Sequence, residues 1–495
     1  MKCNRIKTYF NGASGDSILL IFVRVVTMTA SLLMTRILSD HFSMHDYGTY
    51  SQVMLLINTV MNLTSFGLLD GINFFFCREQ NEERRNAYIS TIFAIHYIMG
   101  FAASLIMLLC TVPISAYFQN EDLKPLIVFC AFSPIVRNSI AMLQVMFVTI
   151  GKAKLIAFRN LIVSALKLVT ILLACFVVDN IIFILCVQLA TDIAQTAYFF
   201  FVLGKNKCRP SIHQFSRELI PQILTYCIPM AMFTMVKALN RDCDKFVVSF
   251  FTDTETLALY ANASKQLPFD IIMSSFCTVL QPYITRYIAE KNYKASVGLY
   301  RAFLEISLLS TGILALSATA VAPELIQFLY TDKYLPGLDV FRIYILIDIL
   351  NIMCITLVLS ASGWTKTILY ISLGAFTLNI GLNILLFKFF GILGPALGTL
   401  VVTLLQGFLI LFYSSKAMHT SLWEMLPIKT ILLFTVETAV LLPILSLLRR
   451  NLADTELPYF LRMIIVGCCF AIPMIMFNFR RMKKDIICIN QCVMD

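Results

Sequence analysis

Apolar residues lie along the chain in blocks of about 20, and only short polar stretches separate these blocks. As a helix, a block of this length crosses a hydrocarbon core of about 30 Å. The pattern therefore predicts an all-α integral membrane protein with about fourteen transmembrane helices. Their predicted extents are 17–39, 48–73, 86–110, 124–149, 154–178, 181–203, 220–250, 256–288, 298–328, 338–362, 366–388, 392–414, 427–448 and 458–478.

The composition fits this class. Hydrophobic residues make up 59% of the 495 residues and charged residues 14%, whereas a soluble protein carries roughly a quarter charged residues. No polar stretch is long enough to fold as a soluble domain, so we expect a transporter and not an enzyme. The apolar run 17–38 carries Arg24 and has no convincing cleavage site. We interpret it as a retained first span and not as a signal peptide.

The lysines and arginines fall mainly in alternate loops, and this asymmetry predicts the orientation. One side collects the basic stretches at 2–7, 78–85, 152–154, 205–217, 286–301, 416–429 and 480–484. The other side has few cations: Arg36, Lys124, Lys333, Lys388, Arg449 and Arg450. We therefore expect both termini in the cytoplasm of a bacterial cell, with the protein in the cytoplasmic (inner) membrane. The net charge of +10 then reflects topology and implies no nucleic-acid partner.

Two short similarities indicate an internal repeat. The segment 47–53 (YGTYSQV) resembles 257–263 (LALYANA), and 151–154 (GKAK) resembles 363–366 (GWTK), both at an offset of about 210 residues. Two such matches at one spacing predict two pseudo-symmetric six-helix lobes. The predicted parts are an N-terminal lobe at 1–203, a cytoplasmic linker at 204–219, a C-terminal lobe at 220–414, and two extra helices with a basic tail at 415–495.

The 15 cysteines lie mostly inside apolar blocks and show no C-x-x-C spacing. Small apolar packing residues have this distribution. We therefore predict no disulfide framework, no metal site and no cofactor.

Polar and charged residues also occur inside the predicted spans, where a charge costs about 2.5–3.5 kcal/mol and requires a partner or a wet cavity. Their helical spacing places several of them on common faces, so we expect these faces to line a water-filled lumen. Cations prevail there and favour an anionic ligand. The candidate substrate-binding cations are Arg24, Arg137, Lys167, Lys237, Arg241, Lys245 and Lys265. The other candidate lumen residues are Asn62, Asp192, Asn240, Asp244, Asn262 and Gln266.

Two structural alternatives stay open. Arg241 and Asp244 could form an internal ion pair that only holds helices together. The isolated carboxylates Asp348 and Glu437 could carry a coupling ion, H⁺ or Na⁺, or could be neutral acids that each make one interhelical hydrogen bond.

The order and spacing of several short motifs resemble the polysaccharide-export or O-antigen flippase family of the multidrug/oligosaccharidyl-lipid/polysaccharide exporter superfamily. The resemblance covers nearly the whole chain. Its motifs are TRIL at 35–38, DYGTY at 46–50, FGLLDGI at 66–72, IPM at 228–230, NRDCDK at 240–245, LYANA at 259–263, QP at 281–282, GWTK at 363–366, NIGLN at 379–383 and GILGPALGT at 391–399.

This resemblance implies a two-lobed transporter of twelve to fourteen helices. Such a protein moves undecaprenyl-pyrophosphate-linked glycan units to the outer leaflet for O-antigen, capsule or exopolysaccharide synthesis. It also implies contacts with membrane lipids, a polysaccharide polymerase and a chain-length regulator as partners, and a cationic lumen that includes Arg24, Lys237, Arg241 and Lys245. Asp244 stands at the position of the family's seventh-span aspartate.

Three other functions compete with this interpretation. A multidrug or metabolite exporter of the same superfamily ranks second, because cationic drugs require acidic cavities. A flippase for a peptidoglycan precursor would handle a chemically similar substrate. An integral-membrane polymerase or glycosyltransferase is disfavoured, because the outer loops are short and the D-x-D sequence at 242–244 lies inside a predicted span among cations.

Overall fold

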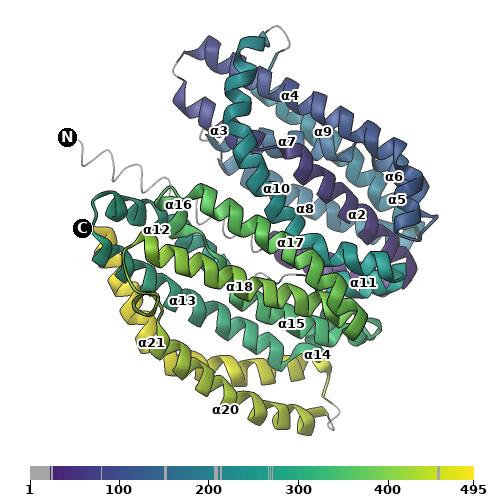
Figure 1. Ribbon diagram of the computed structural model, residues 1–495. Helices are drawn as coiled ribbons and strands as arrows, with labels where there is room; N and C mark the ends of the chain where they lie inside the picture. The colour runs from purple at the N-terminus through teal and green to yellow at the C-terminus, as the bar shows by residue number, and fades with distance from the viewer. Residues whose placement is uncertain are drawn as a thin grey trace. The chain divides into compact units, whose positions relative to one another are not determined.

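The structure is a computed structural model that describes residues 23, 26–79, 81–149, 153–205, 210–211, 214–265, 267, 269, 271–453 and 457–494. Every regular element in these ranges is helical. The chain divides into two compact units (Figure 1). Unit 1 consists of Met1–Asp242 and Ser249–Ala258, and unit 2 consists of Cys243–Val248 and Leu259–Asp495.

Unit 1 begins with a helix over 26–41. It continues with α2 (Met44–Ser65), α3 (Leu68–Arg78), α4 (Glu82–Leu109), α5 (Thr111–Tyr117), α6 (Leu123–Cys130), α7 (Ser133–Thr149), α8 (Ala153–Leu173), a π-helical turn (Ala174–Val178), α9 (Ile181–Lys205), a 3-10 turn (Arg217–Leu219) and most of α10 (Ile220–Phe251). Its apolar core joins α3, α4, α7, α9 and the start of α10, and includes Phe93, Leu143 and Phe199.

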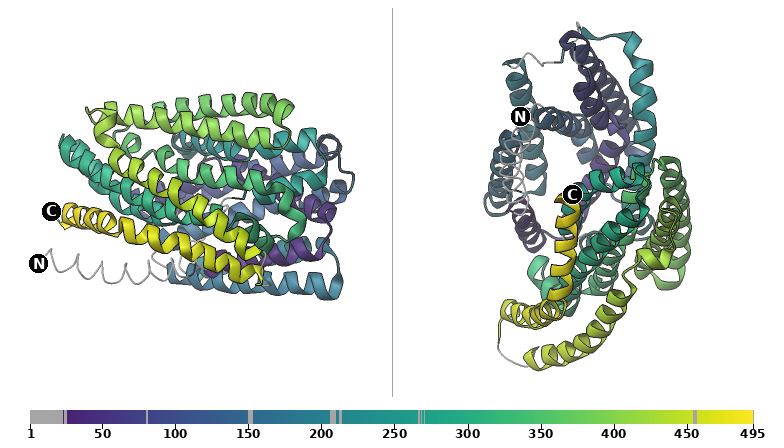
Figure 2. Two further views of the ribbon diagram at one scale, coloured as in Figure 1. Left: turned by 90° about the horizontal axis from the view of Figure 1, so that it is seen from below. Right: turned by 90° about the vertical axis from the view of Figure 1, so that its left-hand side faces the viewer.

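Unit 2 contains α12 (Ile271–Ala289), α13 (Tyr293–Ala320), α14 (Ala322–Leu329), two 3-10 helices (Asp332–Gly337 and Asn351–Cys354), α15 (Leu338–Leu350), α16 (Leu357–Ala361), α17 (Thr365–Phe390), α18 (Leu393–Ala417), α19 (Leu422–Met425), α20 (Ile428–Ala453) and α21 (Tyr459–Met494). Its long helices run roughly side by side (Figure 2). A core around Leu309, Phe434 and Phe470 joins α13, α20 and α21.

Polar residues define several helix starts. Ser43 accepts a hydrogen bond from the backbone N–H of Asp46 at the start of α2. Asn81 accepts from the N–H groups of Glu83 and Arg84 at the start of α4. These caps satisfy backbone donors that have no intrahelical acceptor, which fixes where each helix begins.

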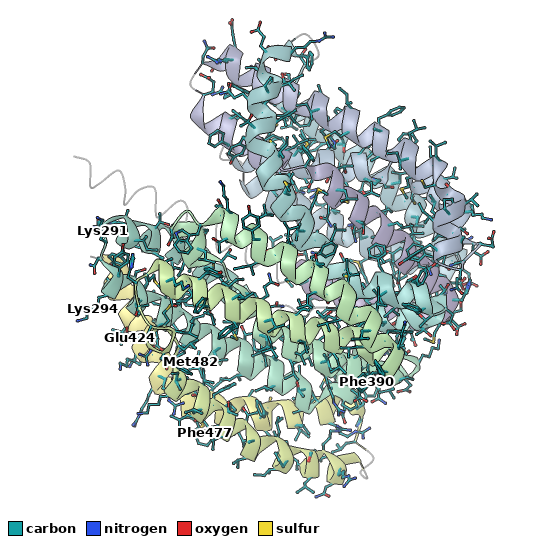
Figure 3. All side chains as sticks on the ribbon, in the orientation of Figure 1. Lys291, Lys294, Phe390, Glu424, Phe477 and Met482 are labelled. Atoms are coloured by element: carbon teal, nitrogen blue, oxygen red, sulfur yellow. The ribbon has the colours of Figure 1, made fainter. Side chains whose placement is uncertain are left out.

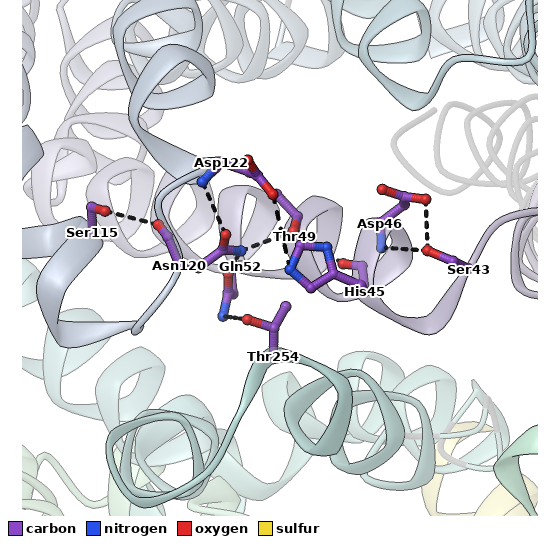
Figure 4. A network of polar contacts seen from close by, with 9 residues as sticks. All are labelled: Ser43, His45, Asp46, Thr49, Gln52, Ser115, Asn120, Asp122 and Thr254. Carbon is purple, nitrogen blue, oxygen red and sulfur yellow. Dashed lines mark hydrogen bonds and ion pairs between the residues drawn. The ribbon is translucent and has the colours of Figure 1, made fainter.

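A buried polar network joins three ends of helices in unit 1 (Figure 4). The Asn120 amide donates to Thr49 and to Gln52, both at 2.8 Å. The Gln52 amide in turn donates to Thr254, the first residue of α11 (Thr254–Ala263), at 3.2 Å. A Cβ on Gly48 would lie 2.5 Å from the Thr254 carbonyl oxygen, so this approach requires glycine. The network therefore ties α2 to the α5–α6 turn and to the start of α11.

The all-helical membrane class is confirmed. Within the described ranges, nine helices are long and apolar enough to cross a membrane, or ten if the bent pair Leu123–Cys130 and Ser133–Phe147 counts as one span. The prediction of about fourteen spans is compatible with this number and stays a prediction. The division into lobes at 204–219 also stays a prediction. The border between the two compact units runs through α10 and α11, so each of these helices contributes residues to both units.

The predicted boundaries differ from the observed helices at several places. The predicted span 48–73 is divided into α2 and α3, and the predicted span 338–362 into α15, a 3-10 helix and α16. The predicted span 124–149 is bent by 42° between α6 and α7. The predicted span 256–288 is divided into α11 and α12. The predicted span 298–328 is divided into α13 and α14, where Pro323 lies in the first turn of the second helix. Hydropathy detects the length of an apolar segment but not a local break in its helix. The sequence therefore predicted one span where the structure has separate helices.

Candidate functional site

Unit 1 contains a charged cluster on its membrane-spanning helices. The guanidinium Nε of Arg137, on α7, lies 3.1 Å from Asp192 Oδ2, on α9. Its NH2 group also donates to the Gln188 side-chain oxygen at 3.2 Å. Gln195 donates to the other Asp192 oxygen at 3.4 Å. Gln188, Asp192 and Gln195 therefore share one face of α9, and Arg137 is held in an ion pair.

Two further cations, both on α8, belong to this cluster. Lys167 and Arg159 are half-buried, and both interact electrostatically with Asp192. Arg159 also donates to the Gln195 side chain and lies over the Phe199 ring. Our sequence analysis did not select Arg159, although a charge inside the predicted span 154–178 was the signal for it.

The charges of this cluster do not balance. Arg137, Arg159 and Lys167 oppose the single carboxylate of Asp192. A half-buried group of helices with excess positive charge favours an anionic ligand, because the ligand supplies the missing counter-charge. The anionic ligand itself stays a prediction.

The cations of α10 are more accessible. Lys237 and Arg241 are exposed and lie one helical turn apart. The side chain of Arg241 is 54% exposed and lies 3.3 Å from Asp242 Oδ2, which is the ion pair that the structure shows for it. Asn240 and Lys245 are half-buried on the same helix.

Asp244 belongs to a buried polar cluster of unit 2. Its carboxylate is 1% exposed and accepts hydrogen bonds from the hydroxyls of Tyr260, at 2.9 Å, and Tyr344. Asn262 is buried on α11, and Lys265 follows that helix and is half-buried. The structure thus gives Asp244 tyrosine donors from two other helices.

The remaining candidates lie apart from these clusters. Glu437, on α20, accepts a hydrogen bond from Asn478 of α21 at 2.7 Å and forms an ion pair with Arg481 at 3.5 Å. Asp348, on α15, and Asn62, on α2, are half-buried. Arg24 and Gln266 lie outside the described residues.

No group of three or more His, Cys, Asp or Glu side chains in the described ranges could hold a metal ion. The clusters above contain cations, amides and single carboxylates. They offer recognition chemistry for an anion.

Comparisons with known proteins agree with this architecture. A family model described as "Polysaccharide biosynthesis protein" matches residues 33–339. The chain is 24% identical over 327 residues to the probable lipid II flippase MurJ of Rickettsia prowazekii (strain Madrid E). The match spans 63% of this chain and 63% of the length of that relative.

Two solved structures share the fold. The lipid II flippase MurJ in an inward closed conformation has a TM-score of 0.74 at 17% identity, and the match covers 94% of this chain and 99% of that one. An inward-facing multidrug resistance MATE family transporter of the MOP superfamily has a TM-score of 0.69 at 11% identity. That match covers 81% of this chain and 98% of the transporter. Both similarities concern the fold.

Proposed function

Because the chain belongs to the polysaccharide biosynthesis protein family, we propose that it is a flippase for lipid-linked oligosaccharides. It moves undecaprenyl-pyrophosphate-linked glycan units from the cytoplasmic to the outer leaflet, for O-antigen, capsule or exopolysaccharide synthesis. It acts by transport and not by covalent chemistry. We place it in the bacterial cytoplasmic membrane with both termini in the cytoplasm.

One observation carries this proposal. Three cations on the spanning helices of unit 1 interact with one carboxylate, and α10 of the same unit carries exposed Lys237 and Arg241. A pyrophosphate cannot cross a hydrocarbon core unaided, because an unpaired charge there is very costly. A cationic path replaces the lost hydration while the polyprenyl tail stays in lipid.

We assign the substrate pyrophosphate to Arg241 and Lys237 first. They are the most accessible of the described candidate cations on this path. Arg137 and Lys167 shape the surrounding positive field, and Arg24 stays a proposed member of the same set. Lys245 and Lys265, which belong to unit 2, stay proposed substrate-binding cations of that unit. A polysaccharide polymerase and a chain-length regulator are the proposed partners that use the exported units.

The test reverses charge at these positions in a strain that lacks the chromosomal gene. Lys237→Glu and Arg241→Glu should each lower surface glycan at least about tenfold, because the introduced carboxylate repels the pyrophosphate. Lys388→Glu, at an exposed position near the end of α17, is the charge-matched control and should leave the glycan unchanged. Membrane levels of all three variants are measured by immunoblot. Normal glycan with Lys237→Glu and Arg241→Glu at normal levels would exclude this assignment.

Ion coupling is a separate part of the proposal. Asp348 and Glu437 are the candidate carriers of H⁺ or Na⁺. Asp348→Asn and Glu437→Gln should slow transport in proteoliposomes that carry an imposed ion gradient. A variant with the wild-type dependence on that gradient removes its residue from this role.

A peptidoglycan-precursor flippase is the second candidate, and the similarity to the lipid II flippase of Rickettsia favours it. The two candidates differ in the phenotype of gene loss. Loss of a precursor flippase blocks cell-wall growth and causes lysis, whereas loss of a surface-glycan flippase leaves the wall intact.

A further inference from the structure

One end of unit 2 carries a group of exposed cations, which we call the basic rim. It consists of Lys291, Lys294, Lys429, Arg480, Lys483 and Lys484. In Figure 3, Lys291 and Lys294 lie near Glu424 and Met482, at the end of unit 2 away from Phe390. In the part of the chain that the structure describes, no salt bridge involves any of these six residues.

Contacts between helices place Lys429, Arg480, Lys483 and Lys484 near one level. Thr430, in the first turn of α20, donates to Glu305 of α13. Asp485, near the end of α21, interacts electrostatically with the same Glu305, so these parts of α20 and α21 lie beside one turn of α13. Tyr293, at the start of α13, lies about 18 Å further along that helix, where it contacts His419 at a ring distance of 5.0 Å. Lys291 and Lys294 therefore lie further out than the other four cations.

The end of α21 extends past this level. The helix has 36 residues, which corresponds to about 54 Å, while a hydrocarbon core is about 30 Å thick. Residues 486–494 continue about 13 Å beyond Asp485. The last turns of α21 therefore lie at the membrane surface or outside it.

This end of α21 has two different faces. Asn478, Asp485 and Ile489 are buried against unit 2. The opposite face exposes Arg480, Lys483 and Lys484, and beside them the side chains of Ile486 and Ile487. A helix face that combines lysines with exposed isoleucines is typical of segments that lie in a lipid headgroup layer.

A tryptophan marks the same end. Trp423, on the short helix α19, is 69% exposed. Glu424 beside it accepts from Thr420, which fixes the turn before α20. Exposed tryptophans of membrane proteins gather at the boundary between hydrocarbon and headgroups, where the ring is buried in the interface and its N–H stays hydrated.

We propose that the basic rim binds anionic phospholipid headgroups of the cytoplasmic leaflet and so anchors α20 and α21 there. Lys429, Arg480, Lys483 and Lys484 complement an acidic lipid surface, and each one attracts such lipids roughly fivefold over neutral lipids when it lies near the surface. Lys291 and Lys294 extend the positive charge outward from that surface. Binding of a soluble anion would require the cations but not the exposed side chains of Trp423, Ile486 and Ile487. The presence of these apolar side chains beside the cations therefore favours a lipid as the ligand. This inference concerns the surface of unit 2 and does not depend on which substrate is transported.

The test uses Trp423 as its reporter. The chain has two tryptophans, so Trp364→Phe leaves Trp423 alone. The full-length protein is placed in vesicles of equal parts phosphatidylglycerol and phosphatidylcholine, with brominated acyl chains on one lipid at a time. Brominated phosphatidylglycerol should quench Trp423 at least about threefold more effectively than brominated phosphatidylcholine.

Removing the charges should remove this preference. Arg480→Gln, Lys483→Gln and Lys484→Gln combined should equalise the two lipids, while Lys388→Gln, near the far end of α17, should leave the preference intact. Equal quenching in the parent protein, or the same loss with Lys388→Gln, would overturn the proposal. Loss of the preference on adding inorganic phosphate, but not sodium chloride of equal ionic strength, would assign the rim to a soluble anion instead.

Discussion

At the scale of single residues, the structure separates cations that are already paired from cations that are accessible. Arg137 was selected with six other cations as a direct substrate contact, yet it bonds Asp192 and Gln188. Lys237 and Arg241 are exposed. Sequence spacing could assign these cations to helix faces, but it could not show which acidic residues they contact. Asp192, for example, lies 55 residues from Arg137 along the chain.

The Arg137–Asp192 pair is expected to contribute mainly to stability. Replacing Arg137 by Gln removes the ion-pair partner of the Asp192 carboxylate, which is 8% exposed. Because Arg159 and Lys167 still offset that carboxylate, the loss should be that of a charged hydrogen bond, roughly 1.5–3 kcal/mol. Adding Asp192→Asn should restore little of this loss, because it leaves Arg159 and Lys167 without their shared carboxylate. Thermal unfolding of the purified protein in detergent measures both effects.

The double variant also separates stability from recognition. A double variant that reaches the membrane at the wild-type level and still exports glycan shows that the pair is structural. A double variant that reaches the membrane at that level but does not export glycan assigns Arg137 to the substrate path. A single Arg137→Gln variant with unchanged unfolding would contradict the predicted role of the pair.

At the scale of elements, the hairpin of α17 and α18 shows how a sequence motif determines the packing of two helices. Gly391 has a φ of +56° and ends α17. A Cβ on Gly394 would lie 2.3 Å from the backbone carbonyl of Leu386, and a Cβ on Gly398 would lie 2.4 Å from the Asn383 side chain. The motif at 391–399 therefore permits close packing of the two helices.

Gly394→Ala should force α17 and α18 apart and sharply reduce the yield of folded protein, because the clash is with backbone atoms that cannot move aside. Gly381→Ala is the matched control in α17, where a Cβ meets nothing within 4 Å. It should be neutral or stabilising by up to about 1 kcal/mol. Fluorescence-detected size-exclusion chromatography measures the folded fraction. Equal yields from the two variants would contradict this account of the hairpin.

The elements that sequence analysis missed share one cause. The bend between α6 and α7 and the separation of α11 from α12 occur inside continuous apolar segments. Hydropathy reports transfer into lipid, while a break depends on tertiary contacts such as those of Asn120 and Thr254. Helices α4, α9, α17 and α18, in contrast, matched their predicted ranges within several residues, because apolar length alone specifies them. The polar last turns of α21 carry no such signal, and that helix continues well past its predicted end.

At the scale of the whole molecule, the fold class and the family could be predicted from the sequence. The ion pairs between residues far apart in the chain could not. The apolar blocks predicted an all-helical membrane protein, and the ordered motifs predicted the family, since each depends on local sequence. Arg449 shows what was missing. It belongs to the predicted cation-poor side, and its guanidinium lies 3.0 Å from buried Glu324 of α14. This long-range ion pair gives Arg449 a reason to be there that charge counting could not supply.

The central claim is that the protein moves lipid-linked oligosaccharide between leaflets, and one measurement tests it most directly. In a strain that lacks the gene, surface glycan is quantified together with polyprenyl-pyrophosphate-linked units on the cytoplasmic leaflet. We predict that the glycan is lost and that linked units accumulate in that leaflet, and that the wild-type gene reverses both. Intact surface glycan without accumulated linked units, combined with increased sensitivity to toxic compounds, would contradict the claim and indicate an exporter.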